Sequence, residues 1–232
     1  MKKVTFLGVL LAVAVCISSC SNTASDPDNT AQVASDSLSV IGDTISENIS
    51  DFTTALHHVT NDINQIPLTG NADRDFAVFL KSHHQGAIDI AQAEIKNGKD
   101  DALKQMAQDI SNTYKSEITA LETFVASLRN GPVKVASGKG DKKDGFNTLI
   151  KKYKAMIWDM AKMDTSMVAD KQFVAVMIPH LQSAVYLAGG YLQYGKDPQL
   201  MGLAKEIIPR KNKQIGELNK WMNKNKNTSS TQ

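Results

Sequence analysis

The chain has 232 residues, of which 42% are hydrophobic, with 26 basic and 24 acidic side chains. The apolar content suffices for one or two compact domains, and the near balance of charge gives no support for a nucleic-acid partner. Both cysteines, Cys16 and Cys20, lie in the first twenty residues. A disulfide is therefore not expected in the folded part, and an apolar core must stabilise it.

Residues 1–19 are predicted to be a lipoprotein signal peptide. Lys2 and Lys3 form a short basic end, and the apolar stretch 4–15 that follows is too short for an ordinary membrane span. The sequence Ile17-Ser18-Ser19-Cys20 resembles the lipobox of bacterial lipoproteins, in which the cysteine is acylated and becomes the first residue. The alternative is an ordinary cleavage site near Ser19, which leaves Cys20 as a free thiol.

Residues 20–43 are predicted to form a flexible tether, because they are rich in Ser, Asp, Asn, Thr and Ala. Removal of the signal also removes Lys2 and Lys3, so that basic and acidic residues balance at 24 each. We expect a protein of the bacterial cell envelope, held at the membrane by a lipid on Cys20 and facing the periplasm or the cell surface. The sequence does not choose between the inner and the outer membrane, and it leaves homo-oligomerisation open.

The rest of the chain contains one unit twice, 97 residues apart. Repeat 1 is assigned to residues 44–128 and repeat 2 to residues 148–225, with a polar linker at 129–147 and a disordered tail at 226–232. From Ala72 to Phe124 the alignment with the second copy needs no gap and gives 15 identities in 53 pairs. A repeat of this size is typical of a supersecondary unit that buries its apolar face against its copy.

Each repeat is predicted to be a short leading helix followed by a tight helical hairpin. In repeat 1 the leading helix starts at a possible capping box, Thr44 to Glu47, and runs to about Ile66. Asp73 can start the next helix and Gly98 can end it. Capping residues of the last helices are predicted to be Asp100 and its counterpart Asp197, which Pro198 follows at the first helical position.

The apolar positions recur at spacings of three and four, as in helices, and no strand pattern or glycine-rich phosphate loop is found. Two hairpins of this kind pack naturally into a four-helix bundle, against which the two leading helices can lie. The predicted fold class is therefore all-α.

His83 and His180 occupy the same position of the repeat, in the middle of an apolar stripe. A buried imidazole needs a partner, and the helical rise places Glu117 opposite His83 and Gln214 opposite His180. These residues, with His84, form either a metal or polar site or a set of satisfied core histidines. The pair His57-His58 is predicted to lie on a solvated face.

Methionines are concentrated in the second repeat, where Met156, Met160 and Met163 follow helical spacing and Met177 lies one turn before His180. Thioether and imidazole together suit a soft ion such as Cu(I). The first repeat has Val59, Ile63 and Ile66 at the positions of the first three methionines. Core packing is therefore favoured over ligation for this stripe.

The strings FAVFLKSHHQGAIDIA and FVAVMIPHLQSAVYLA, each followed by GKD and a helix carrying Glu-Ile or Gln-Ile, resemble the bacterial domain-of-unknown-function 305 family. The resemblance covers residues 73–222. It implies a ferritin-like helical bundle in an exported protein, and it implies copper binding through His and Met residues in some members. The family's paired histidines are kept as His83-His84, whereas the second copy has His180-Leu181.

The sequence leaves two functions open. The first is a lipoprotein that binds a metal ion, most readily copper, for homeostasis rather than catalysis; the alternative is a structural or partner-binding bundle whose metal site has decayed. A di-iron enzyme ranks last because no Glu-x-x-His motif occurs, and no nucleophile is visibly paired with a base. The candidate metal ligands are His83, His84, His180, Met177 and Glu117, with Met156, Met160, Met163 and Gln214 as weaker candidates.

Overall fold

The computed structural model describes residues 51–130, 141–163 and 167–226, all within one compact unit, Val40–Gln232. Every regular element in these ranges is an α-helix. The elements are a helix over residues 51–65, α2 (Ala72–Asn97), α3 (Asp101–Asn130), α4 (Asp141–Met160), α5 (Ala169–Tyr194) and α6 (Pro198–Lys224). The predicted all-α class is confirmed.

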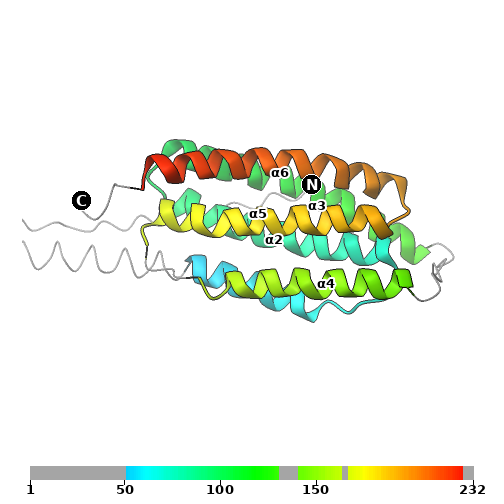
Figure 1. Ribbon diagram of the computed structural model, residues 1–232. Helices are drawn as coiled ribbons and strands as arrows, with labels where there is room; N and C mark the ends of the chain where they lie inside the picture. The colour runs from blue at the N-terminus through cyan, green and yellow to red at the C-terminus, as the bar shows by residue number, and fades with distance from the viewer. Residues whose placement is uncertain (1–50, 131–140, 164–166, 227–232) are drawn as a thin grey trace, which may run out of the picture. The chain divides into compact units, whose positions relative to one another are not determined.

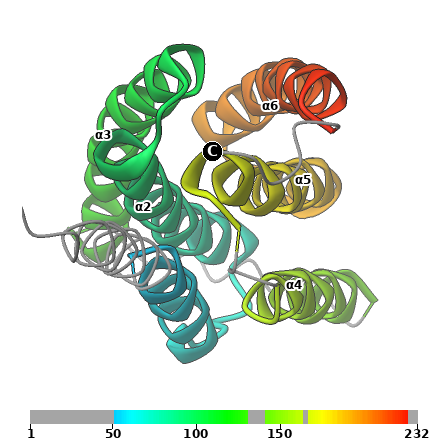
Figure 2. The same cartoon turned by 90° about the vertical axis from the view of Figure 1, so that its left-hand side faces the viewer.

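The helices form a four-helix bundle built from two hairpins, α2–α3 and α5–α6, as predicted (Figure 1). The hairpins meet mainly through α2 and α5. Seen from the end, helix 51–65 and α4 lie together on one side of the bundle (Figure 2). Lys154 of α4 joins these two leading helices, because its Nζ donates to the carbonyls of Asn64 and Ile66 at 3.1 and 3.2 Å.

Repeat-equivalent aspartates cap the last helix of each hairpin, as predicted. Asp100 Oδ1 accepts from the amides of the second and third residues after it, and Asp197 Oδ1 does the same in the second copy. Pro198 occupies the first turn of α6. The prediction for α2 was wrong in detail, since its N-cap is Asn71, whose side chain accepts from the amides of Asp73 and Arg74.

Asp73 instead caps the other repeat. Its Oδ1 accepts from the amides of Lys196 and Asp197 in the α5–α6 turn, at 2.8 and 3.2 Å, and from the Tyr191 hydroxyl at 2.6 Å. The same exchange occurs in reverse, because Asp170 Oδ1 accepts from the amides of the α2–α3 turn. Each hairpin turn is thus completed by the carboxylate that begins the central helix of the other copy.

Gly98 is the C-cap residue of α2, as predicted, and Gly195 is that of α5. Their φ angles are −67° and −71°, which any residue can adopt. A Cβ would instead lie 2.3 Å from Oε1 of Glu94 in the first turn and 2.1 Å from the Tyr191 ring in the second. Glycine is required because a buried side chain closes over each turn.

Helix α4 begins at Asp141, inside the stretch 129–147 that its polar composition assigned to a linker. Phe146 explains the earlier start, because this side chain is 2% exposed and packs into the core. The predicted capping box, signal peptide and tether, Cys20 included, lie outside the described residues, as does most of the predicted tail.

The core is one apolar cluster to which every described helix contributes. Its central helix, α5, has the length and apolar composition to cross a membrane, but 61% of its most apolar window is buried within the protein. Burial in a bundle core favours the same composition as a membrane span. The composition of α5 is therefore accounted for by its central position.

Candidate metal centre

His83 of α2 and His180 of α5 meet at the centre of the bundle. Both side chains are fully buried, and their rings stack at a centroid distance of 3.9 Å and an interplanar angle of 14°. His83 Nδ1 also forms a 3.1 Å hydrogen bond with the Tyr153 hydroxyl of α4. Because the two histidines are equivalent residues of the repeat, they lie on the approximate two-fold axis that relates the copies.

A second pair of equivalent residues, Tyr114 of α3 and Lys211 of α6, meets in the same way. Both are fully buried, and the Lys211 Nζ lies 3.6 Å from the centroid of the Tyr114 ring. The His84 ring stacks on the same tyrosine at 4.3 Å. The ammonium group of Lys211 therefore lies close to the histidines, and its charge acts on all three of them.

Glu117 of α3 contacts His84, not His83 as the register predicted. The distance from His84 Nε2 to Glu117 Oε2 is 2.7 Å, and the other carboxylate oxygen accepts a hydrogen bond from Arg210 of α6. The second copy has no equivalent arrangement, because His84, Glu117 and Arg210 correspond to Leu181, Gln214 and Thr113. The symmetric histidine pair thus has an ionic group on one side only.

Burial keeps the three imidazoles neutral. It lowers the pKa of His83 well below its ordinary value, and the nearby basic groups of His180, His84 and Lys211 add to this effect. Burial also lowers the pKa of His180 to about 3 and that of His84 to about 4, the latter against the opposing effect of Glu117. The neutral imidazole is the form that ligates metals.

The charged residues beside the histidines shift one another. Burial lowers the pKa of Lys211 to about 7, although Glu117 opposes that shift. Burial alone would raise the pKa of Glu117, but the hydrogen bond from His84 and the charges of Lys211 and Arg210 bring it below its usual value. The single carboxylate of Glu117 therefore interacts with the basic side chains of Lys211 and Arg210 and with the imidazole of His84.

Several polar atoms of the cluster have no hydrogen-bond partner among the residues that the structure describes. They are His83 Nε2, His84 Nδ1, both ring nitrogens of His180, Lys211 Nζ, the Tyr114 hydroxyl and Gln214 Oε1. Buried polar atoms of this kind usually bind a protein group, a water or an ion. Within the described ranges, however, no three His, Cys, Asp or Glu side chains converge in a ready-made metal site.

The predicted methionine ligands differ in how deeply their side chains are buried. Met177 is fully buried on α5, one helical turn before His180. Met160 is 2% exposed and Met163 is half-buried against the core, as expected for packing residues, and Met156 is also half-buried. His57 and His58 are exposed, as predicted.

The sequence reasoning missed Lys211, Arg210, Tyr114 and Tyr153. A signal for two of them was present in the repeat alignment. The apolar stripe of α6 is interrupted between Ile207 and Leu218 at Lys211, and the equivalent position of α3 holds Tyr114. A lysine on a buried stripe, aligned with a buried tyrosine, marks a polar position inside the bundle.

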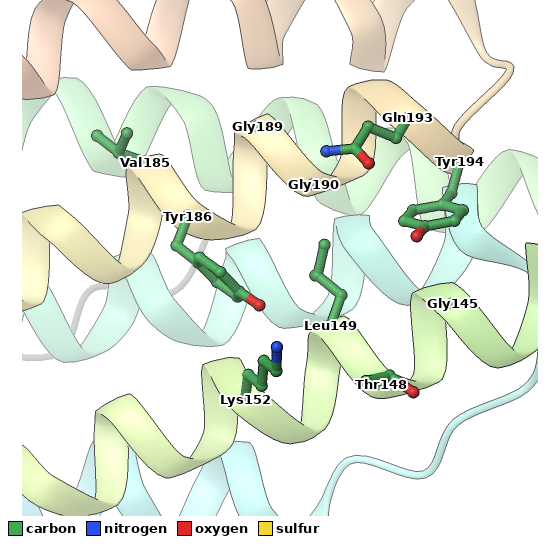
Figure 3. Close-up of a pocket in the computed structure, with 10 residues that line it drawn as sticks. All are labelled: Gly145, Thr148, Leu149, Lys152, Val185, Tyr186, Gly189, Gly190, Gln193 and Tyr194. Atoms are coloured by element: carbon green, nitrogen blue, oxygen red, sulfur yellow. The ribbon is translucent and has the colours of Figure 1, made fainter.

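A groove lies apart from these residues, between α4 and α5 (Figure 3). Lys152 of α4 and Tyr186 of α5 point toward each other across it, and Leu149 points toward Gly190. A Cβ on Gly190 would lie 1.6 Å from Leu149 Cδ1, so this glycine permits the close approach of the two helices. No histidine, methionine or carboxylate lines the groove, and it lacks metal ligands.

The family model described as Domain of unknown function (DUF305) matches residues 58–125 and 73–222. The chain belongs to the DUF305 family. The two overlapping matches agree with the tandem copies found in the sequence, and the longer one contains all three histidines of the cluster. None of the curated proteins compared with the chain matches it.

Solved structures resemble the chain at low sequence identity. A secreted DUF305 protein from Streptomyces coelicolor is 16% identical, with 68% of this chain and 95% of that chain covered and a TM-score of 0.51. CopM in its Cu(I)-bound and Cu(II)-bound forms is 24% identical, with 66% and 96% covered and a TM-score of 0.49. At these identities the likeness to the Streptomyces coelicolor protein supports the fold alone.

Proposed function

We propose that this protein binds copper as Cu(I) at the buried cluster of His83, His84 and His180, and that it does so without catalysing a reaction. One observation carries the proposal. Three neutral imidazoles lie near one another in the interior, with the His83 ring stacked on His180 at 3.9 Å and 6.0 Å from the His84 ring, and four of their ring nitrogens have no partner among the described residues. Leaving buried polar atoms unpaired is unfavourable, so an ion that uses them gains affinity from their position.

The surroundings favour a soft ion of low charge. Imidazole nitrogen and the thioether of Met177 are ligands that Cu(I) accepts, and Cu(I) is stable with few ligands. The buried ammonium of Lys211 and the guanidinium of Arg210 repel a cation in proportion to its charge. The repulsion is therefore weaker for Cu(I) than for a divalent ion such as Zn²⁺.

The residues that would hold the ion are His83, His84, His180 and Met177, with Glu117 as the carboxylate beside them. Because the His83 and His180 rings are stacked, we expect one of them to rotate when both bind the same ion. The Tyr153 hydroxyl, bonded to His83 Nδ1, can fix which nitrogen of that ring remains available. Bound copper would supply coordination only.

Titration with Cu(I) in the presence of a competing chromophoric chelator tests this proposal. We expect about one equivalent to bind to the chain and none to the variant His83→Ala/His84→Ala/His180→Ala. The matched control His57→Ala/His58→Ala removes two exposed histidines and should bind as the unaltered chain does. Met177→Leu copies Leu80 of the first repeat, keeps the core apolar, and should weaken Cu(I) binding about tenfold, which is about 1.4 kcal/mol.

Failure to bind Cu(I) more tightly than tens of micromolar, about −6 kcal/mol, would overturn the copper proposal. It would favour the second candidate, a structural or partner-binding bundle. The observation behind that candidate is that no group of three His, Cys, Asp or Glu side chains among the described residues is arranged to hold a metal ion. The histidines would then be core residues that use water for their remaining hydrogen bonds.

We further propose that the protein is exported and anchored by a lipid on Cys20. The basic, apolar and lipobox segments of residues 1–20 support this, as does the polar stretch that follows. Incorporation of a labelled fatty acid into the chain in its bacterial host is the test. We expect label in the unaltered chain and none after Cys20→Ser, whereas label that survives this substitution would rule out the anchor at this residue.

A further inference from the structure

The outer face of α4 combines lysines with an exposed tryptophan. Lys151, Ala155, Trp158 and Lys162 recur at spacings of four, three and four, which places them on one side of the helix and its last turn. All four are exposed, and 51% of the Trp158 surface is accessible. The Lys162 Nζ lies 5.9 Å from the centre of the Trp158 ring. We call these four residues the lysine–tryptophan face.

The first repeat provides an internal comparison for this face. Its leading helix has Thr54, His58, Asn61 and Gln65 at the equivalent positions, and all four are exposed there too. Both helices pack on the same side of the same bundle (Figure 2), so the architecture does not require tryptophan or lysine at these positions. The lysine–tryptophan face therefore needs an explanation other than folding.

The charge and shape of the lysine–tryptophan face indicate which kind of partner it binds. Lys151, Lys152 and Lys162 are exposed on α4 and the turn that follows it. Asp159, the one acidic residue among the described side chains there, pairs with Lys162 at 2.9 Å and leaves an excess of positive charge. The face is a single convex helix with one large apolar side chain, which is small for a stable protein interface. Tryptophan flanked by lysines is instead typical of the headgroup region of a membrane, where the indole ring is partly buried and the ammonium groups meet phosphates.

We propose that the lysine–tryptophan face rests on an anionic phospholipid surface, with Trp158 inserted at the level of the headgroups. This contact would orient the bundle with α4 toward the membrane. It is independent of copper binding and does not require acylation of Cys20, although an anchor there would keep the face close to the bilayer.

The test uses the chain of residues 21–232, which lacks Cys20 but retains every described helix and the whole core. Trp221→Phe, which copies Phe124 of the first repeat, leaves Trp158 as the one fluorescent tryptophan. We expect sedimentation with vesicles of phosphatidylglycerol and phosphatidylcholine, a blue shift of the Trp158 emission and quenching by brominated lipid. Binding to pure phosphatidylcholine should be at least tenfold weaker, and high salt should weaken binding to the anionic vesicles.

The variant Lys151→Thr/Trp158→Asn/Lys162→Gln carries the residues of the first repeat and should bind anionic vesicles at least tenfold more weakly. A matched control, Lys205→Gln/Lys220→Gln, removes two exposed lysines from α6 and should retain most of the binding. Equal binding by the triple variant and the unaltered chain would overturn the proposal. So would a blue shift of Trp158 that depends on protein concentration without vesicles, because this result would assign the face to contact between copies.

Discussion

Replacing Glu117 with glutamine is expected to lower the free energy of unfolding by about 3 kcal/mol at pH 7. The substitution preserves the shape of the side chain and gives it the residue found in the second repeat, Gln214. It removes the carboxylate that contacts His84 and Arg210 and that acts on the charge of the fully buried Lys211. Urea unfolding followed by circular dichroism measures the effect, and Glu206→Gln, at an exposed position on α6, should change the free energy by less than about 0.5 kcal/mol.

The substitution Lys211→Met tests whether Glu117 stabilises the fold by balancing the charge of Lys211. Alone, this substitution removes an ammonium group whose Nζ has no hydrogen-bond partner among the described residues, and we expect it to stabilise the protein. In the Glu117→Gln background it should recover part of the lost stability, with a coupling free energy above about 1 kcal/mol. Additive effects of the two substitutions would show that Glu117 stabilises the fold through His84 and Arg210 and not through the charge of Lys211.

Glu94→Gln is expected to stabilise the protein by about 2 kcal/mol at pH 8 and by almost nothing at pH 5. Glu94 is fully buried at the end of α2, and neither of its oxygens has a partner among the described hydrogen bonds. Burial and, to a smaller extent, the adjacent carboxylate of Asp170 together raise its pKa to about 9. The second copy has Tyr191 at this position, and its hydroxyl donates to Asp73.

The direction of the pH dependence follows from the raised pKa. Above the ordinary range near 4.5, the unfolded chain releases the Glu94 proton, whereas the folded chain retains it up to about pH 9. Unfolding therefore releases a proton, and stability falls as the pH rises through this window. Glutamine has no proton to lose. The free energy of unfolding, measured in urea, should therefore fall less between pH 5 and pH 8 for the variant than for the unaltered chain. An equal fall in both proteins would contradict the raised pKa of Glu94.

The repeat made much of the fold predictable. The starts of α3 and α6 were predictable because helix capping depends on a few adjacent residues. Asp100 caps α3, and Asp197 with Pro198 begins α6. Asp73 shows the limit of that approach. Asn71 lies two residues earlier and takes the capping role, which leaves Asp73 to bind a turn more than a hundred residues away. Local reasoning cannot rank two possible caps when one has a distant partner.

The candidate site was predictable in its composition and less so in its pairings. Counting the helical rise placed Glu117 opposite His83, but a shift of one residue brings His84 to the carboxylate and turns His83 toward the two-fold axis. Stacking between equivalent residues follows from how the copies face each other, which the sequence of one hairpin does not contain. Lys211 was missed because a lysine is expected at the surface unless its aligned partner is considered.

The reciprocal caps have a consequence for the order in which the chain is made. When the ribosome has produced only the first hairpin, the amides of its turn have no carboxylate to bind, because Asp170 has yet to be synthesised. The second hairpin emerges later and finds Asp73 already in place. The first hairpin therefore remains incomplete until the second has been synthesised. The hydrogen bonds of both turns form together when the two hairpins dock.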